Sequence, residues 1–285
     1  MSKFETIVEG LGFPEGPAFL PDGSVAFVDL LHQCVRRYRA GETSVIARLD
    51  GSPNGMRLGP DGALYIANNG GVAPDGLHAV KVMDNQVTGR IQRVSLDGLV
   101  EDVVTDLPGE GPWRPNDLVF SPEGKVMFTD PQNWEQVEDW GTEGRIPGYG
   151  GGRLFAASIG GPATHLLDFY GFTNGLAFHP DGSLLVAMTL LKAIIKLPWH
   201  GDRVGQPTMW CQFEDGTAPD GILIHEDLLY VAGSLGDRVS VVDMGGRHVR
   251  AIEMEAGSDP TNLAVGGGKL WITLGLPGKL VTMDL

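Results

Sequence analysis

The sequence is short of several features that mark common classes of protein. It has only two cysteines, Cys34 and Cys211, in 285 residues, which is too few for a disulfide framework and favours a reducing, cytoplasmic setting. Its 21 Lys and Arg are outnumbered by 36 Asp and Glu, giving a formal net charge of −15. A nucleic-acid partner is therefore not expected, because duplex binding needs concentrated positive charge to displace counterions.

Long apolar runs and sustained helical periodicity are missing too. Without 18 consecutive apolar residues the chain is not expected to span or bind a membrane, and MSKFETIVEG at its start lacks the apolar core of a secretory signal. Apolar residues still make up 42% and charged residues 20%, which excludes a disordered chain. What is plentiful is glycine, with 42 residues, about twice the usual share, and this indicates many tight turns.

One pattern occurs six times along the chain. Each copy is a short apolar strand, a tight turn that often contains Pro-Asp-Gly or Pro-Glu-Gly, and a second strand rich in β-branched and aromatic residues, as in a β-hairpin. The copies span residues 13–30, 52–69, 114–131, 172–189, 218–234 and 259–275. Two weaker strand signals follow each of the first five copies. Six four-stranded antiparallel units predict an all-β, six-bladed β-propeller, with residues 1–285 as a single domain.

The sixth unit is one strand short, because only KLVTMDL follows its hairpin. The segment FETIVEG, residues 4–10, precedes the first hairpin and belongs to no other unit. We therefore expect this N-terminal strand to join the last blade, which closes the ring and removes an open sheet edge.

Aligning the six copies places one residue of each at the entrance to the innermost strand. These residues are Glu15, Asn54, Asn116, Asn174, Asp220 and Thr261. Because the position is equivalent in every blade, the side chains are expected to converge on one mouth of the central channel. Carboxylate and amide oxygens suit hard divalent cations such as Ca²⁺, Mg²⁺ or Mn²⁺.

The alternative explanation is local turn chemistry, since Asn-Gly and Asp-Gly favour turns wherever they occur. It accounts less well for Glu15, and for Asn116 and Thr261, which stay polar without a following glycine. For Glu15, Asn174 and Asp220 together, metal binding is the favoured interpretation. Asp22, Asp61 and Asp181, which belong to the Pro-Asp-Gly strings at the far ends of the hairpins, are interpreted as turn residues.

At these positions the sequence resembles the SMP-30/gluconolactonase/LRE-like propellers. The matching strings are PEGPAFLPDGSVAFVD, RPNDLVFSPEGKVMFTDP, TNGLAFHPDGSLLVA, PDGILI and PTNLAVGGGKLWIT, between residues 14 and 273. The resemblance implies hydrolysis of sugar lactones with one divalent metal ion, which is Ca, Zn, Mn, Mg or Fe in different members. It implies that Glu15, Asn174 and Asp220 bind the metal. It also implies that Asn116 lies beside the metal or substrate, as a direct ligand in the related diisopropylfluorophosphatase-like propellers, and that Arg114 contacts substrate oxygens.

A lactone is an activated ester, so its hydrolysis requires delivery of water and stabilisation of an oxyanion. A divalent cation can do both, and the chain has no G-x-S-x-G string to suggest a serine nucleophile. Asp220 is the first candidate for the general base and Glu15 the alternative. The residues themselves leave that choice open, and both carboxylates could be pure ligands.

Two insertions, residues 70–89 and 131–152, lengthen the spacing between hairpins, and long loops in compact domains are often functional. The second carries Trp134, and Trp113 precedes Arg114. Together with Asn54 and Asn116, these aromatic side chains are candidate substrate contacts, for a lactone bulkier or less polar than gluconolactone if the insertion covers the mouth. The alternative is that the tryptophans cover the side of a blade.

Three functions therefore stay open. The favoured one is a metal-dependent lactonase acting on a sugar-derived or related small lactone, as a monomer or small homo-oligomer. The first alternative is a phosphotriesterase of the diisopropylfluorophosphatase type on the same scaffold. The second, weaker alternative is a non-catalytic metal-binding propeller.

Overall fold

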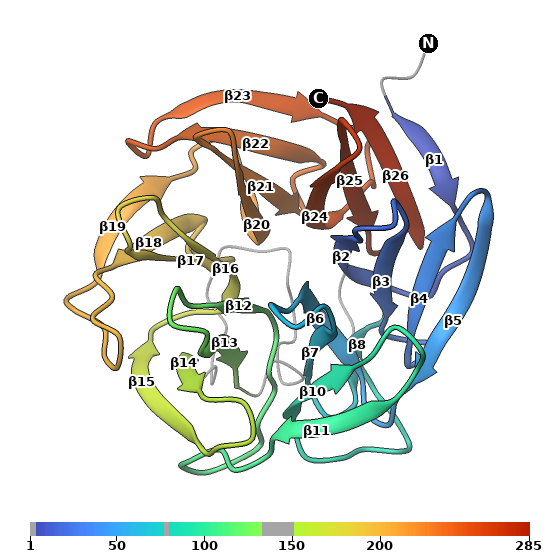
Figure 1. Cartoon of the computed structure of the whole chain (residues 1–285). Helices are drawn as coiled ribbons and strands as arrows, with labels where there is room; N and C mark the ends of the chain where they lie inside the picture. The colour runs from blue at the N-terminus through green and yellow to red at the C-terminus, as the bar shows by residue number, and fades with distance from the viewer. Residues whose placement is uncertain (1–3, 77–79, 133–150) are drawn as a thin grey trace.

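The computed structural model describes residues 4–76, 80–132 and 151–285, and in these ranges the chain forms β-strands joined by turns and loops. Six four-stranded antiparallel sheets surround a central channel, which Figure 1 views end-on. The predicted all-β, six-bladed propeller is confirmed. Within the described ranges, no helix has the length and apolar character needed to cross a lipid bilayer.

The first three blades use strands in chain order from the channel outward, except that an extra hairpin interrupts the second. Blade one contains β2 (Pro14–Phe19), β3 (Val25–Asp29), β4 (Cys34–Arg39) and β5 (Glu42–Arg48). Blade two contains β6 (Pro53–Leu58), β7 (Leu64–Asn68), β10 (Arg90–Val94) and β11 (Val100–Val104). Blade three contains β12 (Leu118–Phe120), β13 (Val126–Pro131), β14 (Gly152–Ala157) and β15 (Ala163–Phe169).

The last three blades repeat the arrangement and bring the chain back to its start. Blade four contains β16 (Thr173–Phe178), β17 (Leu184–Met188), β18 (Ala193–Leu197) and β19 (Thr208–Gln212). Blade five contains β20 (Ala218–His225), β21 (Leu228–Ser234), β22 (Arg238–Asp243) and β23 (His248–Glu253). Blade six contains β24 (Pro260–Gly266), β25 (Lys269–Leu274), β26 (Lys279–Asp284) and, outermost, β1 (Glu5–Val8).

Strand β1 closes the ring as predicted. It pairs antiparallel with β26, with Glu5 opposite Thr282 and Thr6 opposite Val281, and Figure 1 shows the two strands side by side. Pairing the first strand with the last covers the edge that blade six would otherwise present.

The hydrophobic core lies between neighbouring blades. The second strands of the hairpins, such as β3, β7 and β17, are buried along their whole length, because both faces of each sheet pack against another blade. This explains why these strands read as continuous apolar runs rather than as alternating patterns. Outer strands such as β5 are mostly exposed and correspondingly polar.

The turns of the hairpins form as their sequence predicts. Asp22, Asp61 and Asp181 each accept a hydrogen bond from the backbone amide two residues ahead, at 3.1, 3.2 and 3.0 Å. This is the local geometry of an Asx turn. The interpretation of these three acids as turn residues is confirmed.

One hairpin was not predicted. Within the first insertion, β8 (Val72–Pro74) pairs with β9 (Val80–Val82). The signal was present in the sequence, since residues 74–76 are another Pro-Asp-Gly string. The flanking apolar runs are only three residues long, so their alternation was too short to identify.

Candidate metal-binding and active site

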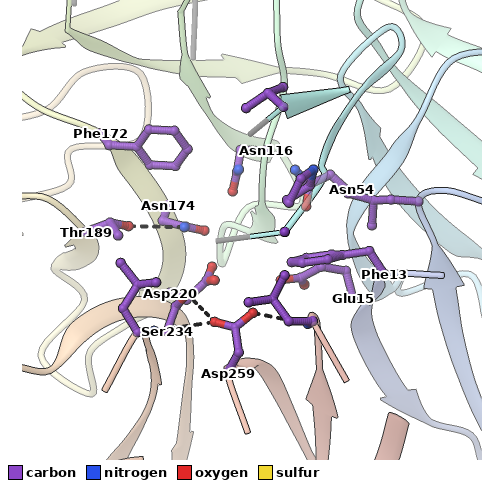
Figure 2. A pocket seen from close by; sticks show the side chains of 16 residues that line it. Phe13, Glu15, Asn54, Asn116, Phe172, Asn174, Thr189, Asp220, Ser234 and Asp259 are labelled. Atoms are coloured by element: carbon purple, nitrogen blue, oxygen red, sulfur yellow. Dashed lines mark hydrogen bonds between the residues drawn. The ribbon is translucent and has the colours of Figure 1, made fainter. Parts of the chain in front are cut away.

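A pocket opens at one mouth of the channel, where the inner strands begin. The space among its lining side chains is about 710 Å³, a figure that includes open solvent at the mouth. Five of the six aligned residues line it, namely Glu15, Asn54, Asn116, Asn174 and Asp220, and Figure 2 shows their side chains around one space. The predicted convergence of these five residues is therefore observed.

A bulge at the start of the inner strands aims these side chains. The register of β2 against β3 shifts between Glu15 and Ala18, and corresponding shifts occur at the start of β6, β16 and β20. A bulge turns a side chain away from the direction it would take in a regular ladder. In each of these strands the shift begins at or just before the residue that lines the pocket.

Thr261 differs from the other five. In β24 the register shift falls between Pro260 and Asn262, so Thr261 itself is the extra residue. Its hydroxyl donates to the carbonyl of Pro14 at 3.1 Å and bonds Thr273 Oγ1 at 2.9 Å, and Thr261 does not line the pocket. The expectation that it would join the ring of oxygen ligands is wrong.

Asp259, two residues earlier, lines the pocket in this part of the ring. Its carboxylate accepts hydrogen bonds from the Ser234 hydroxyl at 2.8 Å and the Leu276 amide at 3.2 Å. Sequence reasoning missed this residue because it precedes the aligned position. An Asp just before a Pro in the sixth copy, where other copies have Phe, Ser, Arg or Ala, was the available signal.

Asn174 is held in a defined orientation by its neighbour Thr189. The Asn174 amide nitrogen donates to Thr189 Oγ1 at 3.2 Å, and that hydroxyl donates onward to the carbonyl of Pro219 at 2.8 Å. With its nitrogen engaged, Asn174 turns its side-chain oxygen toward the centre of the pocket (Figure 2). This is the orientation that a cation ligand requires.

Glu15 is fixed on the other side of the pocket. Its Oε2 accepts hydrogen bonds from the backbone amide of Gly16 at 2.7 Å and from Asn262 Nδ2 at 3.0 Å. Burial, and secondly the nearby Asp117 carboxylate, raise the pKa of Glu15 to about 7. A carboxylate so enclosed is costly to ionise unless a cation compensates it.

Beneath Glu15 lies a polar network that the sequence did not predict. Asn262 Nδ2 also lies 3.3 Å from Asp117 Oδ2, and Arg57 Nη2 donates to the same oxygen at 3.1 Å. Asp117 therefore lies behind the pocket-lining residues, held between Asn262 and Arg57. Arg57 and Asn262 lie within sequences typical of ordinary strands, so the sequence analysis did not identify either residue as part of the site.

Glycine at two aligned positions makes room for this network. A Cβ on Gly55 would lie 2.5 Å from Asp117 Oδ1, and a Cβ on Gly221 would lie 2.2 Å from the Asn262 side-chain carbon. Real side chains do not approach so closely. The glycines that follow Asn54 and Asp220 therefore serve the packing of the channel as well as turn formation.

Asp220 lies among other acids. Burial raises the pKa of Asp220 well above its usual value, and the carboxylates of Glu15, Asp259 and Asp117 raise it further. Asp220 nevertheless keeps part of its surface accessible at the pocket. It is therefore placed to exchange a proton with a molecule bound there.

This donor set fits a hard divalent cation. Glu15 and Asp220 supply carboxylates, Asn174 directs an amide oxygen inward, and Asn116 and Asn54 contribute further amides to the same pocket. The described residues contain no cluster of three or more Asp, Glu, His or Cys that could hold a metal. A site built from two carboxylates and amides does not depend on such a cluster.

Arg114 and Trp113 lie in a different hollow, next to residues 86–89 and Pro112. Arg114 Nη1 donates to the carbonyls of Asn69 at 3.2 Å and Trp113 at 3.3 Å. Contact between either side chain and a substrate in the mouth pocket stays a prediction. Trp134 and most of the second insertion lie outside the described residues.

Comparison with known proteins is consistent with this geometry. The family model described as "SMP-30/Gluconolactonase/LRE-like region" matches residues 13–275. A gluconolactonase from Zymomonas mobilis subsp. mobilis is 25% identical over 214 residues, which is 65% of this chain and 51% of that protein. This chain thus aligns with about half the length of that relative.

Solved structures share the fold. A gluconolactonase from Xanthomonas campestris superposes with a TM-score of 0.78 at 22% identity, covering 99% of this chain and 89% of that one. Regucalcin from Agrobacterium tumefaciens, a calcium-binding protein, superposes with a TM-score of 0.74 at 18% identity, covering 98% and 92%. At these identities the likeness establishes the fold alone.

Proposed function

The chain belongs to the SMP-30/gluconolactonase/LRE-like family, and from this premise we propose that it is a metal-dependent hydrolase that opens the ring of a small lactone. The observation that carries the proposal is the convergence of Glu15, Asn116, Asn174 and Asp220 on one pocket. The gluconolactonase from Zymomonas mobilis that resembles this chain supports a lactone as substrate. The calcium bound by regucalcin supports a divalent cation.

In this proposal Glu15, Asn116, Asn174 and Asp220 hold the metal. When bound, a divalent cation would polarise the lactone carbonyl and lower the pKa of water beside it. Glu15 would be a fixed ligand, because two hydrogen bonds already hold its Oε2. Asn174 would present its oxygen because Thr189 holds its nitrogen. Asn54, from blade two beside the blade of Glu15, would face the substrate in the pocket.

Asp220 is the general base in this mechanism. A base works best when its pKa lies near the working pH, and burial, followed by the surrounding acids, raises the pKa of Asp220 above its usual value. Asp220 accepts a proton from water as that water adds to the acyl carbon. The acyl–oxygen bond then breaks, the ring oxygen takes a proton, and a hydroxy acid leaves.

The first test restores metals to chelator-treated protein one at a time. Ca²⁺, Mg²⁺, Mn²⁺, Zn²⁺ and Fe²⁺ are each added, and hydrolysis is followed on lactones and, in parallel, on organophosphate triesters. We expect lactone hydrolysis to return with at least one metal and to exceed triester hydrolysis. A protein inactive on every lactone, with each of the five metals bound, would contradict the proposal.

Substitutions of Asp220 separate metal binding from base catalysis. Asp220→Ala removes a ligand, so we expect calcium binding by calorimetry and lactone hydrolysis to fall together. Asp220→Asn keeps an oxygen ligand but cannot accept the proton, so hydrolysis should fall by at least a hundredfold more than metal affinity. Asp181→Ala, in a hairpin turn, is the matched control and should change neither. An undiminished rate in Asp220→Ala would contradict the assignment.

A further inference from the structure

The walls of the mouth pocket differ in character from its floor. The floor is made by the oxygen-bearing residues of the inner strands. Above it the lining is largely apolar, with side chains from four blades and from the β8–β9 hairpin, namely Phe13, Leu30, Val80, Phe172, Leu235 and Leu276. Among the described residues that line this pocket, none is a lysine, arginine or histidine.

Two phenyl rings stand on opposite sides of this pocket. Phe13 and Phe172 each lie two residues before the pocket-lining residue of their strand, in blades one and four. These blades are opposite one another in a ring of six, and Figure 2 shows the two rings across the pocket from each other. The Phe13 ring packs directly against Gly275, so closely that a Cβ on this glycine would lie 2.4 Å from the ring. Both phenylalanines are largely buried, and their rings form apolar walls of the pocket.

Leu235 occupies a backbone conformation that is unusual for leucine. Its φ is 62°, in the left-handed region where Gly and Asn are much more readily accommodated. Its side chain is 40% exposed, so burial in the core does not explain it. Asp259 supports this turn through Ser234 and through the Leu235 amide at 3.4 Å. A strained residue at the rim of a pocket is a reason to suspect a functional role.

The remaining polar side chains of the wall are already engaged within the protein. Thr189 donates to Pro219, Ser234 donates to Asp259, and Asp259 accepts from two backbone amides as well. A polyhydroxylated ring would bury hydroxyl groups against apolar side chains and polar groups that already have partners. Buried hydroxyls without partners weaken binding, whereas each buried methylene strengthens it.

We propose that the substrate is a lactone whose ring carries a hydrocarbon substituent, with that substituent seated among Phe13, Phe172, Leu235 and Leu276. This inference rests on the proposed lactonase function and narrows its substrate class. The lactone carbonyl meets the oxygen-lined floor while the alkyl or aryl group contacts the walls. Hydrolysis adds one water across the acyl–oxygen bond and yields a hydroxy acid.

The test measures hydrolysis of three kinds of six-membered lactone by the metal-loaded protein. They are δ-valerolactone, its 5-alkyl derivatives of increasing length, and glucono-δ-lactone. We expect kcat/KM to rise by about three- to fourfold for each methylene added until the walls are filled. Glucono-δ-lactone should be the poorest of the three. A preference for glucono-δ-lactone would overturn the inference and leave the lactonase function intact.

A substitution in the pocket wall tests whether the preference for alkyl lactones arises there. Leu235→Asn keeps a residue that accepts the left-handed conformation but removes the apolar side chain. We expect kcat/KM to fall about tenfold for the longest alkyl lactone and to change less than twofold for δ-valerolactone. Leu99→Asn, at an exposed turn of blade two and 59% accessible, is the matched control and should change neither. Equal losses of kcat/KM on both lactones in Leu235→Asn would contradict the proposed binding position of the hydrocarbon substituent.

Binding of lactams separates the two proposals. A 5-alkyl δ-valerolactam and a polyhydroxylated lactam resist hydrolysis. Calorimetry with each therefore measures binding to the pocket without a contribution from catalysis. Tighter binding of the alkyl lactam, together with no hydrolysis of any lactone, would refute the lactonase function and uphold the apolar seat. Tighter binding of the polyhydroxylated lactam would refute the seat, whatever the catalytic result.

Discussion

The acid-rich mouth pocket predicts that metal-free protein loses stability as the pH rises from 5 to 8. The pKa of Glu15 is about 7 in the folded chain against 4.5 for the free side chain. A raised carboxyl pKa means that the folded state binds the proton more tightly than the unfolded state. Its contribution is therefore present at low pH and is lost as the pH rises through about 7.

The size of the effect follows from the displacement of this pKa. Each pKa unit corresponds to about 1.4 kcal/mol, so Glu15 alone should remove roughly 2.5 kcal/mol of the free energy of unfolding between pH 5 and 8. For a chain of this length the entropy of unfolding is about 0.6 kcal/mol per degree, so the melting temperature should fall by about 4 °C. Asp220 and Asp117, whose pKa values are also raised, act in the same direction.

The assay is calorimetric melting in excess chelator across this pH range, for the wild type and for Glu15→Gln. The variant cannot ionise at this position, so its melting temperature should decline less steeply than that of the wild type. Carboxylates whose pKa is lowered, such as Asp22 and Asp181, contribute stability that is lost only below about pH 4 and do not affect the comparison. Parallel profiles for the two proteins would refute the reasoning.

Further predictions concern metal affinity, the polar network and the ring. Calcium must displace the proton of Glu15, so its dissociation constant should fall about tenfold between pH 6 and 8 by calorimetry; a pH-independent constant would contradict this. Arg57→Met leaves Asp117 buried without its cation and should lower the free energy of unfolding in urea by about 3 kcal/mol, with Asp117→Asn restoring most of it. Failure of the double variant to recover would contradict the pairing. Thr189→Val releases the Asn174 amide and leaves the Pro219 carbonyl without the Thr189 hydroxyl, so calcium binding should weaken about tenfold and the melting temperature should fall by about 2–5 °C; unchanged calcium affinity would contradict this. Deleting residues 1–8 removes β1 and should produce concentration-dependent association in sedimentation, because the edge of β26 is exposed; a monomer of unchanged stability would contradict it.

The repeated hairpins made the fold predictable from sequence. Strands with continuous apolar character, spaced by Pro-Asp-Gly turns, specify packed blades, and the unpaired segment at residues 4–10 specified closure. The same alignment located Glu15, Asn174 and Asp220, because equivalent positions of a closed ring must face one channel. It failed at Thr261, whose hydroxyl bonds to Pro14 and Thr273 within the protein and does not line the pocket.

The supporting residues could not be found in the same way. Asp117 and Asn262 fit there because Gly55 and Gly221 leave space for their side chains, and Arg57 donates to Asp117. That space exists between blades, so it depends on contacts between residues far apart in the chain. Asp259 likewise acquires its role from turns in blades five and six. A repeat alignment compares equivalent positions and does not report what lies between them.

The hydrogen bond between Asn262 and Glu15 joins residues 247 positions apart, which bears on when the site can form during synthesis. A growing chain carries Glu15 early, but Asn262 becomes available only when β24 of blade six has been made. A cation bound by Glu15 and Asp220, as we propose, would favour the state in which this bond between blades one and six has formed. Metal binding would then be thermodynamically linked to closure of the ring, and calcium present during refolding should favour closed chains.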